Sequence, residues 1–149
     1  MYTIGQVSKM TGLPVSTLRY YDREGLFPDL ERDAGIRQFS EAEIEIIKTI
    51  DCLKKSGLEI KAIRQFLEWA KQGESTFPER LQLLEAQREV MKEEMDKLAE
   101  TLAMIDYKCW YFAQAIEMGE EAADQIPPEQ MPPAIREVWS RLKQETPEH

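Results

Sequence analysis

Residues 3–26 read TIGQVSKMTGLPVSTLRYYDREGL, and this stretch decides the fold of the N-terminal part of the chain. It opens with Thr3 and, three positions later, a glutamine, a pair typical of a capping box at the start of a helix. Gly12 predicts the end of that helix, and Pro14 suits the first turn of a second helix that Gly25 would end. Two short helices joined by a glycine-containing turn predict a helix-turn-helix.

The sequence that follows predicts a wing and two more helices. Residues 26–39 contain a proline and a glycine and have no helical period, which predicts a short β-hairpin with its turn near residues 33–35. Helices with apolar stripes are expected from Ser40 to a stop at residues 56–57 and from Leu58 to Lys71, where Gly73 would close the second one. A second capping box opens the first of them. We therefore expect a winged helix-turn-helix DNA-binding domain over residues 1–73.

A long helix with a coiled-coil seam is predicted over residues 76–118. Thr76 and Glu79 are expected to form a third capping box at its start. Apolar residues then recur every seven positions over about five heptads, with Glu and Lys on the other faces. The predicted seam consists of Phe77, Leu84, Met91, Leu98, Ile105 and Phe112. Because a single chain would leave this seam exposed, the pattern predicts a homodimer.

The last part of the sequence, residues 119–149, is acidic and rich in proline. One short helix is expected there, from Pro133 to about Lys143, and the final residues are expected to be frayed. The fold class predicted for the whole chain is thus mainly α, with a small β-hairpin wing in the N-terminal domain.

The net charge of −9 is unevenly distributed along the chain. Residues 1–72 hold eleven basic and eleven acidic residues, so residues 73–149 carry the whole excess. Since phosphate contacts require Lys and Arg, the neutral N-terminal half is the half expected to bind DNA. The chain has no run of 18 apolar residues and no charged-then-apolar leader, which predicts a cytoplasmic protein.

Four strings of this sequence resemble those of the MerR family of bacterial transcription regulators. They are YTIGQVS at 2–8, LRYYDREGL at 18–26, GIRQFS at 35–40 and LKKSGL at 53–58. The resemblance covers about residues 1–117, and the Leu-Arg-Tyr-Tyr-Asp run followed by Gly-x-Arg-x-Phe at this spacing is highly specific.

The resemblance implies a mechanism of transcription control. Two antiparallel long helices would pair and hold two DNA-binding domains, the heads of the dimer, on a pseudo-palindromic promoter. The bound dimer would then bend and untwist the promoter spacer so that RNA polymerase can engage the promoter. This mechanism requires no cofactor and no enzyme activity. The sequence also has no phosphate-cradling Gly loop and no Cys/His or Ser/His pair.

The second helix of the head is expected to read the major groove of duplex DNA. The residues placed to read bases are Val15, Ser16, Thr17 and Arg19. By the resemblance, Tyr20 would give its hydroxyl to a phosphate, with Arg19 and the wing residue Arg37 supplying charge. The alternative for the two adjacent tyrosines is packing, and one of Tyr20 and Tyr21 is expected to fill the core. Lys9, Arg23 and Lys61 are weaker candidates for DNA contacts.

Metal sensing is a known theme of the family, but this sequence does not support it. Metal-sensing members place one Cys near the start of the dimer helix and two after its end. Here Ser75, Thr76 or Phe77 occupies the first position, no Cys follows Gly119, and the only His is His149. Because soft metals favour thiolates, no metal site is predicted.

Cys52 is a candidate sensor of electrophiles or thiol stress. The string IDCLKKSG at 50–57 resembles the branch of the family that responds to aldehydes and other electrophiles. Lys48 and Lys55 lie one helical turn from Cys52 and could favour the thiolate, whereas the nearby helix C-terminus would oppose it. The alternative is that Cys52 is a small, half-buried packing residue.

An aromatic group near the end of the long helix offers another hypothesis. Tyr107, Trp110 and Tyr111, together with Trp139, could line a pocket for an apolar small molecule, or they could simply pack. The string KCWY at 108–111 resembles the same electrophile-responsive branch. A further alternative is an architectural DNA-binding protein that senses nothing.

Overall fold

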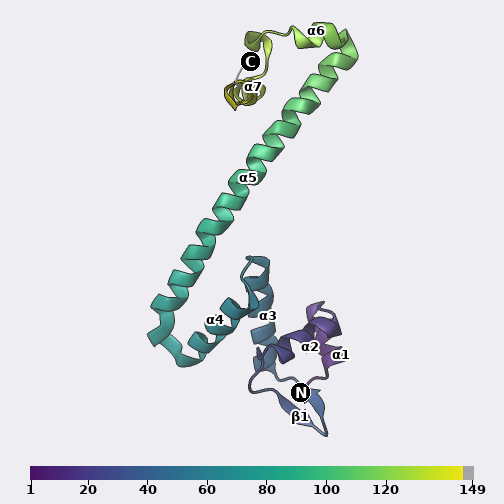
Figure 1. Cartoon of the computed structure of the whole chain (residues 1–149). Helices are drawn as coiled ribbons and strands as arrows, with labels where there is room; N and C mark the ends of the chain where they lie inside the picture. Colours follow the sequence, from purple (N-terminus) through teal and green to yellow (C-terminus); the bar gives the residue numbers. More distant parts are fainter. Residues whose placement is uncertain (146–149) are drawn as a thin grey trace. The chain divides into compact units, whose positions relative to one another are not determined.

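The computed structural model describes residues 1–145, and it is mainly helical, as predicted (Figure 1). The chain folds into two compact units, residues 1–91 and the residues from 92 onward. The expected frayed end and His149 lie outside the described residues. Among residues 1–145, no helix combines the length and the apolar character needed to cross a membrane.

The first unit contains four helices, one hairpin and the first part of a long helix. In chain order, its elements are α1 (Ile4–Thr11), α2 (Val15–Arg23), β1 (Glu31–Asp33), β2 (Ile36–Gln38), α3 (Glu41–Lys55), α4 (Ile60–Gln72), the short 3₁₀ helix η1 (Gly73–Thr76) and α5 (Phe77–Met118), which continues into the second unit. The second unit adds α6 (Glu120–Asp124), the 3₁₀ helix η2 (Pro128–Gln130) and α7 (Pro133–Glu145).

Local sequence signals account for the boundaries of α1 and α2. The Gln6 amide donates to Thr3 Oγ1 at 3.2 Å and the Thr3 amide donates to Gln6 Oε1 at 2.8 Å, which confirms the first capping box. Gly12, at φ +75°, ends α1 in the left-handed conformation. Pro14 has an extended backbone and occupies the N-cap of α2, so the prediction that it lies inside the first helical turn is wrong by one residue.

The predicted wing is an antiparallel hairpin with a two-residue turn. Ala34 at φ +50° and Gly35 at φ +80° form the turn, in the region predicted for it. Positive φ at both central residues is the requirement of a type I′ turn, whose twist matches that of the two strands. A bridge between Tyr2 and Phe39 then joins the start of the chain to the end of the wing.

The core of the first unit lies between α1, α2, α3, α4 and the wing. Its buried side chains are Val7, Leu18, Tyr21, Leu26, Phe27, Phe39, Ile47, Ile50, Leu53, Leu58 and Ile63. Tyr21 is only 4% exposed whereas Tyr20 is 40% exposed, which confirms that one of the two tyrosines fills the core. The capping box at the start of α3 is also confirmed, because the Ser40 amide donates to Glu43 Oε2 at 2.7 Å.

The third predicted capping box, at Thr76, is wrong. The Thr76 hydroxyl lies 2.5 Å from the carbonyl oxygen of Trp69 and 2.8 Å from that of Gly73. Arg80 Nε donates to the same hydroxyl at 3.1 Å. Because η1 runs directly into α5, Thr76 is the last residue of a 3₁₀ turn, and its side chain bonds back toward the end of α4.

The second unit contains two short helices that the sequence did not predict, α6 and η2. The predicted C-terminal helix is confirmed as α7. Its apolar side includes the buried Ile135 and Val138, while Trp139 and Leu142 are half-buried.

Candidate nucleic-acid interface

One face of α2 is exposed and polar, while the opposite face is buried. Ser16, Arg19, Tyr20 and Arg23 are all exposed, and their spacing of three, one and three residues places them on the same side of the helix. Within the described residues, neither Arg19 nor Arg23 forms an ion pair. The face therefore offers two guanidinium groups and two hydroxyl groups to a ligand.

The other two predicted base-reading residues, Val15 and Thr17, lie in the first turn of α2 and are half-exposed. Arg23 extends the exposed face toward the end of the helix. Its position four residues after Arg19 is a sequence signal for one helical face, so this weaker candidate for a DNA contact shares the exposed face with Arg19.

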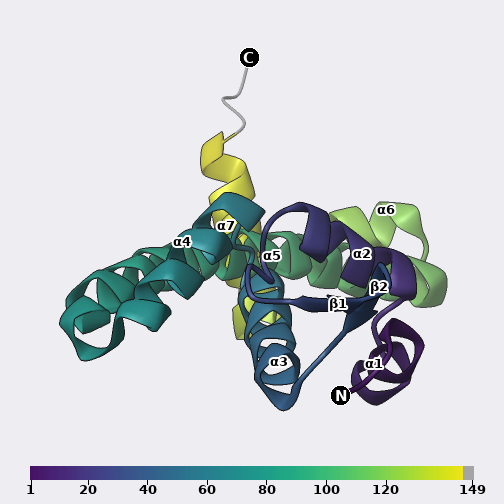
Figure 2. The same ribbon diagram turned by 90° about the horizontal axis from the view of Figure 1, so that it is seen from below.

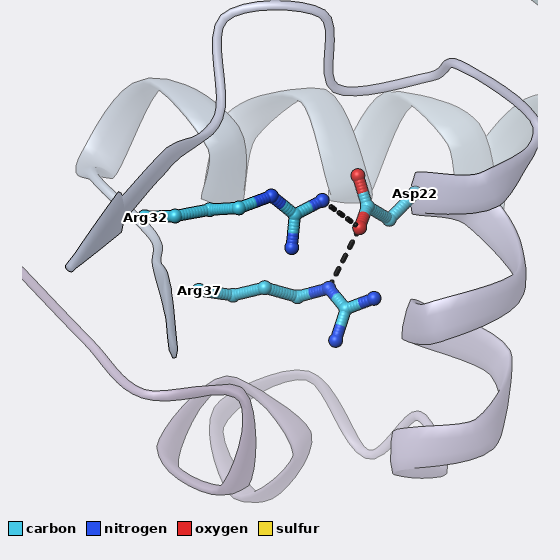
Figure 3. Close-up of polar contacts among 3 residues, drawn as sticks. All are labelled: Asp22, Arg32 and Arg37. Carbon is cyan, nitrogen blue, oxygen red and sulfur yellow. Dashed lines mark hydrogen bonds and ion pairs between the residues drawn. The ribbon is translucent and has the colours of Figure 1, made fainter. Parts of the chain in front are cut away.

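The wing is fastened to α2 by a carboxylate shared between two arginines (Figure 3). Arg32 Nη2 lies 2.7 Å and Arg37 Nε 2.6 Å from the same oxygen, Oδ2 of Asp22. Arg32 comes from β1, Arg37 from β2 and Asp22 from α2, so the three residues join both strands of the wing to the helix beside it (Figure 2). This cluster carries a net charge of +1.

The carboxylate of Asp22 is held in its ionised form. Burial raises the pKa of the Asp22 carboxyl. The hydrogen bonds and charges of Arg37 and Arg32 lower it by more than burial raises it, so the pKa of Asp22 lies below its usual range. Sequence reasoning missed Asp22 and Arg32, which lie ten residues apart in the chain. The one signal in the sequence for this cluster was Asp22 itself, an acidic residue on a helix that is expected to lie near DNA phosphates.

A second contact holds the same C-terminal end of α2, at its C-cap residue Glu24. Arg64 of α4 donates from Nε to the Glu24 carbonyl oxygen at 2.8 Å, and its Nη2 lies 3.3 Å from Glu24 Oε2. Together with the wing cluster, this contact fixes the orientation of α2 on the core of the first unit.

Cys52 lies on α3 and its thiol is exposed, which disagrees with the half-buried packing alternative. The two lysines proposed to activate it have carboxylate partners. Lys48 Nζ lies 2.7 Å from Glu45 Oε1, and Lys55 Nζ lies 2.9 Å from Asp51 Oδ2. These hydrogen bonds raise the pKa of both lysines, so a large part of their charge is already compensated by acidic neighbours.

Of the four aromatic residues of the predicted pocket, two contact each other and the other two have different partners in the second unit. The ring centroids of Tyr107 and Trp110 are 6.3 Å apart, and Trp139 lies under Lys143 Nζ at 5.5 Å from its centroid. The Tyr111 hydroxyl donates to an oxygen of Asp124, and this hydrogen bond raises the pKa of Tyr111 to about 12.

A cleft of about 330 Å³ in the same unit is lined by other residues. They are Glu100, Thr101 and Met104 of α5 and Val138, Arg141, Leu142 and Glu145 of α7. None of the four predicted aromatic residues is in this lining, so the ligand-pocket hypothesis gains no support from the cleft.

A winged helix-turn-helix with an exposed, cationic face on its second helix defines the class of DNA-binding proteins to which this chain belongs. Comparison with known proteins gives the family. The model of the MerR HTH family regulatory protein matches residues 2–69. An uncharacterized HTH-type transcriptional regulator of Haemophilus influenzae is 33% identical over 127 residues, which cover 85% of this chain and 94% of that protein.

Two further proteins are similar to this chain. The HTH-type transcriptional regulator AdhR of Bacillus subtilis is 37% identical over 98 residues, which cover 65% of each protein. The crystal structure of HiNmlR, described as a MerR family regulator lacking the sensor domain and bound to promoter DNA, superposes with a TM-score of 0.65 at 32% identity. This superposition covers 84% of the present chain and 98% of the HiNmlR chain. The chain belongs to the MerR family of transcription regulators, as the resemblance of its sequence predicted.

Proposed function

We propose that this MerR-type regulator binds and distorts a pseudo-palindromic promoter as a homodimer. The observation that carries the proposal is the exposed face of α2, on which Arg19 and Arg23 have no ion-pair partner among residues 1–145. The similarity to HiNmlR, whose structure contains promoter DNA, supports the same function for this chain. In the proposal, Val15, Ser16, Thr17 and Arg19 read base edges and the Tyr20 hydroxyl binds a phosphate.

The homodimer would place two such faces at a fixed separation. The predicted seam of α5 is apolar and largely exposed in the single chain, which supports pairing through residues 76–118. Contacts from two heads would supply the energy for bending the promoter spacer, and RNA polymerase would respond to the distorted promoter rather than to a direct contact. In the proposal, residues 1–73 form the DNA-binding domain and residues 119–149 form a C-terminal extension.

Binding of the full chain to the DNA upstream of its own coding region tests this function. We expect Arg19→Ala to weaken specific binding by about 1–3 kcal/mol, as for loss of a base-edge or close phosphate contact. Fluorescence anisotropy with a labelled duplex measures the affinity, and a scrambled duplex measures specificity. Lys108→Ala removes an exposed cation of α5 and serves as the matched control. An unchanged affinity for Arg19→Ala excludes Arg19 from the interface, and equal affinity of the wild type for both duplexes rejects the function.

We also propose that Cys52 gives the regulator a response to electrophiles or thiol stress. Exposure of its thiol is the observation in favour, because a reagent can reach it. Lys48 and Lys55 are paired with acidic residues, which argues against strong stabilisation of the Cys52 thiolate by these lysines. The alternatives are a regulator that responds to an apolar small molecule and an architectural DNA-binding protein without an effector. Both predict that the response does not depend on Cys52.

A further inference from the structure

We infer that Asp22 is a positioning residue that holds Arg32 and Arg37 together as a paired guanidinium site for one phosphate of the DNA. The inference deepens the proposed function, on which it rests, by assigning roles to two residues outside the predicted interface and by giving Arg37 a defined geometry. Asp22 itself would not touch the DNA.

The geometry of the cluster shows what Asp22 does. Its side chain is only 9% exposed, and both ion pairs end on one oxygen, so the two guanidinium groups must lie close to each other (Figure 3). Arg32 and Arg37 are cross-strand partners in the hairpin, so its register places two guanidinium groups side by side, where they repel each other. The shared carboxylate offsets this repulsion and ties both strands of the wing to α2.

The arginines retain donors that the carboxylate does not use. Asp22 accepts from Arg37 Nε and from Arg32 Nη2. The two terminal nitrogens of Arg37 and the Nε and Nη1 of Arg32 have no other partner within the described part of the chain. Since the cluster keeps a net charge of +1 and a planar fork of N–H groups, a phosphate fits its remaining bonding capacity.

The location of the cluster connects it to the recognition face. Asp22 follows the exposed Arg19 and Tyr20 on α2, so the wing arginines lie beside the helix proposed to enter the major groove. An acidic side chain at a DNA interface normally weakens binding, because it repels phosphates. If Asp22 acts by positioning the arginines, its removal must weaken binding, although the removal makes the protein less negative. The two effects have opposite signs, so an experiment can separate them.

The test measures binding of the full chain to the duplex from its own upstream region, over a range of salt concentrations. We expect Asp22→Asn to weaken binding roughly tenfold, the scale of one charge-assisted hydrogen bond, and to make the salt dependence shallower by about one unit of slope for each phosphate that is no longer bound. Asp33→Asn removes the same charge from the exposed end of β1 and is the matched control. It should bind as tightly as the wild type or more tightly.

Two further variants separate positioning from damage to the fold. Asp22→Glu keeps the carboxylate and should recover most of the affinity lost in Asp22→Asn. Arg32→Lys keeps the positive charge on the exposed wing but loses the planar fork of N–H groups, so it should weaken DNA binding. This variant tests the inference even if Asp22→Asn does not fold. Equal or tighter binding by Asp22→Asn, or wild-type binding by Arg32→Lys, overturns the inference and leaves the proposed function intact. Lack of any duplex preference in the wild type overturns both.

Discussion

Adjacent residues of α2 have different tasks because a helix turns by about 100° per residue. Tyr20 is exposed on the polar face, Tyr21 is buried in the core, and Asp22 faces the wing. The same local logic applies to Cys52 on α3, where the neighbours one turn away are lysines. In the folded chain those lysines pair with acidic residues on their own helix, so the accessible thiol lies near Lys55, a cation whose charge Asp51 partly compensates.

At Cys52, this environment leads to a prediction that uses the second cysteine of the chain as its control. Promoter binding and transcription by the wild type should change after treatment with an aldehyde or diamide, whereas Cys52→Ser should give the same result before and after. Cys109 is also exposed, and Cys109→Ser should respond as the wild type does. A Cys52→Ser protein that still responds to these reagents rules out this residue as the sensor.

The wing turn shows how one element stores a small amount of backbone strain. Ala34 adopts a positive φ of 50°, which is uncommon for a residue with a Cβ, and Gly35 follows at φ +80°. Turns of this type favour Asn-Gly over Ala-Gly, since Asn tolerates the left-handed conformation better than Ala. The hairpin thus forms with a turn residue that is not optimal.

Ala34→Asn should therefore stabilise the protein. We expect the free energy of unfolding to rise by about 0.5–1 kcal/mol, measured by urea denaturation at fixed protein concentration. Ala34→Val, with a β-branched side chain at the same φ, should lower it by a similar amount or more. The interpretation of strain is incorrect if the valine variant is as stable as the asparagine variant.

On the scale of the whole molecule, the apolar row along α5 is the feature that a single chain leaves unsatisfied. Five of the six predicted seam residues are between 40% and 70% exposed, and Met91 is half-buried. An apolar row of this length on a water-exposed helix is typical of an interface. Pairing with a second copy through this row remains a prediction, and the proposed spacing of two reading heads depends on it.

Leu98→Glu should convert the dimer to a monomer in sedimentation equilibrium. Each dimer would lose two buried leucines and would have to bury two carboxylates, a cost of about 4 kcal/mol or more. Ala99 is the next residue, is exposed and lies outside the seam, so Ala99→Glu adds the same charge and should remain dimeric. A wild-type chain that sediments as a monomer at micromolar concentration contradicts the homodimer.

Much of this architecture could be predicted because its signals are local. The capping boxes at Thr3 and Ser40, the glycine that ends α1 and the turn of the wing all depend on residues within four positions of each other. The prediction failed at Thr76, where the same local pattern occurs. There the side chain found partners on α4 and at the start of η1, which the spacing of residues along the chain could not reveal.

By itself, the sequence determined the order of helices, the hairpin, the apolar row of α5, the membership of the MerR family and the helix expected to read DNA. Only the tertiary structure decided which charges are engaged: Asp22 with Arg32 and Arg37, and Lys48 and Lys55 with their acidic neighbours. The reason is physical. Helical periods and caps are properties of neighbouring residues, whereas the partner of a charged side chain depends on how separate elements pack and on which of several nearby groups is closest.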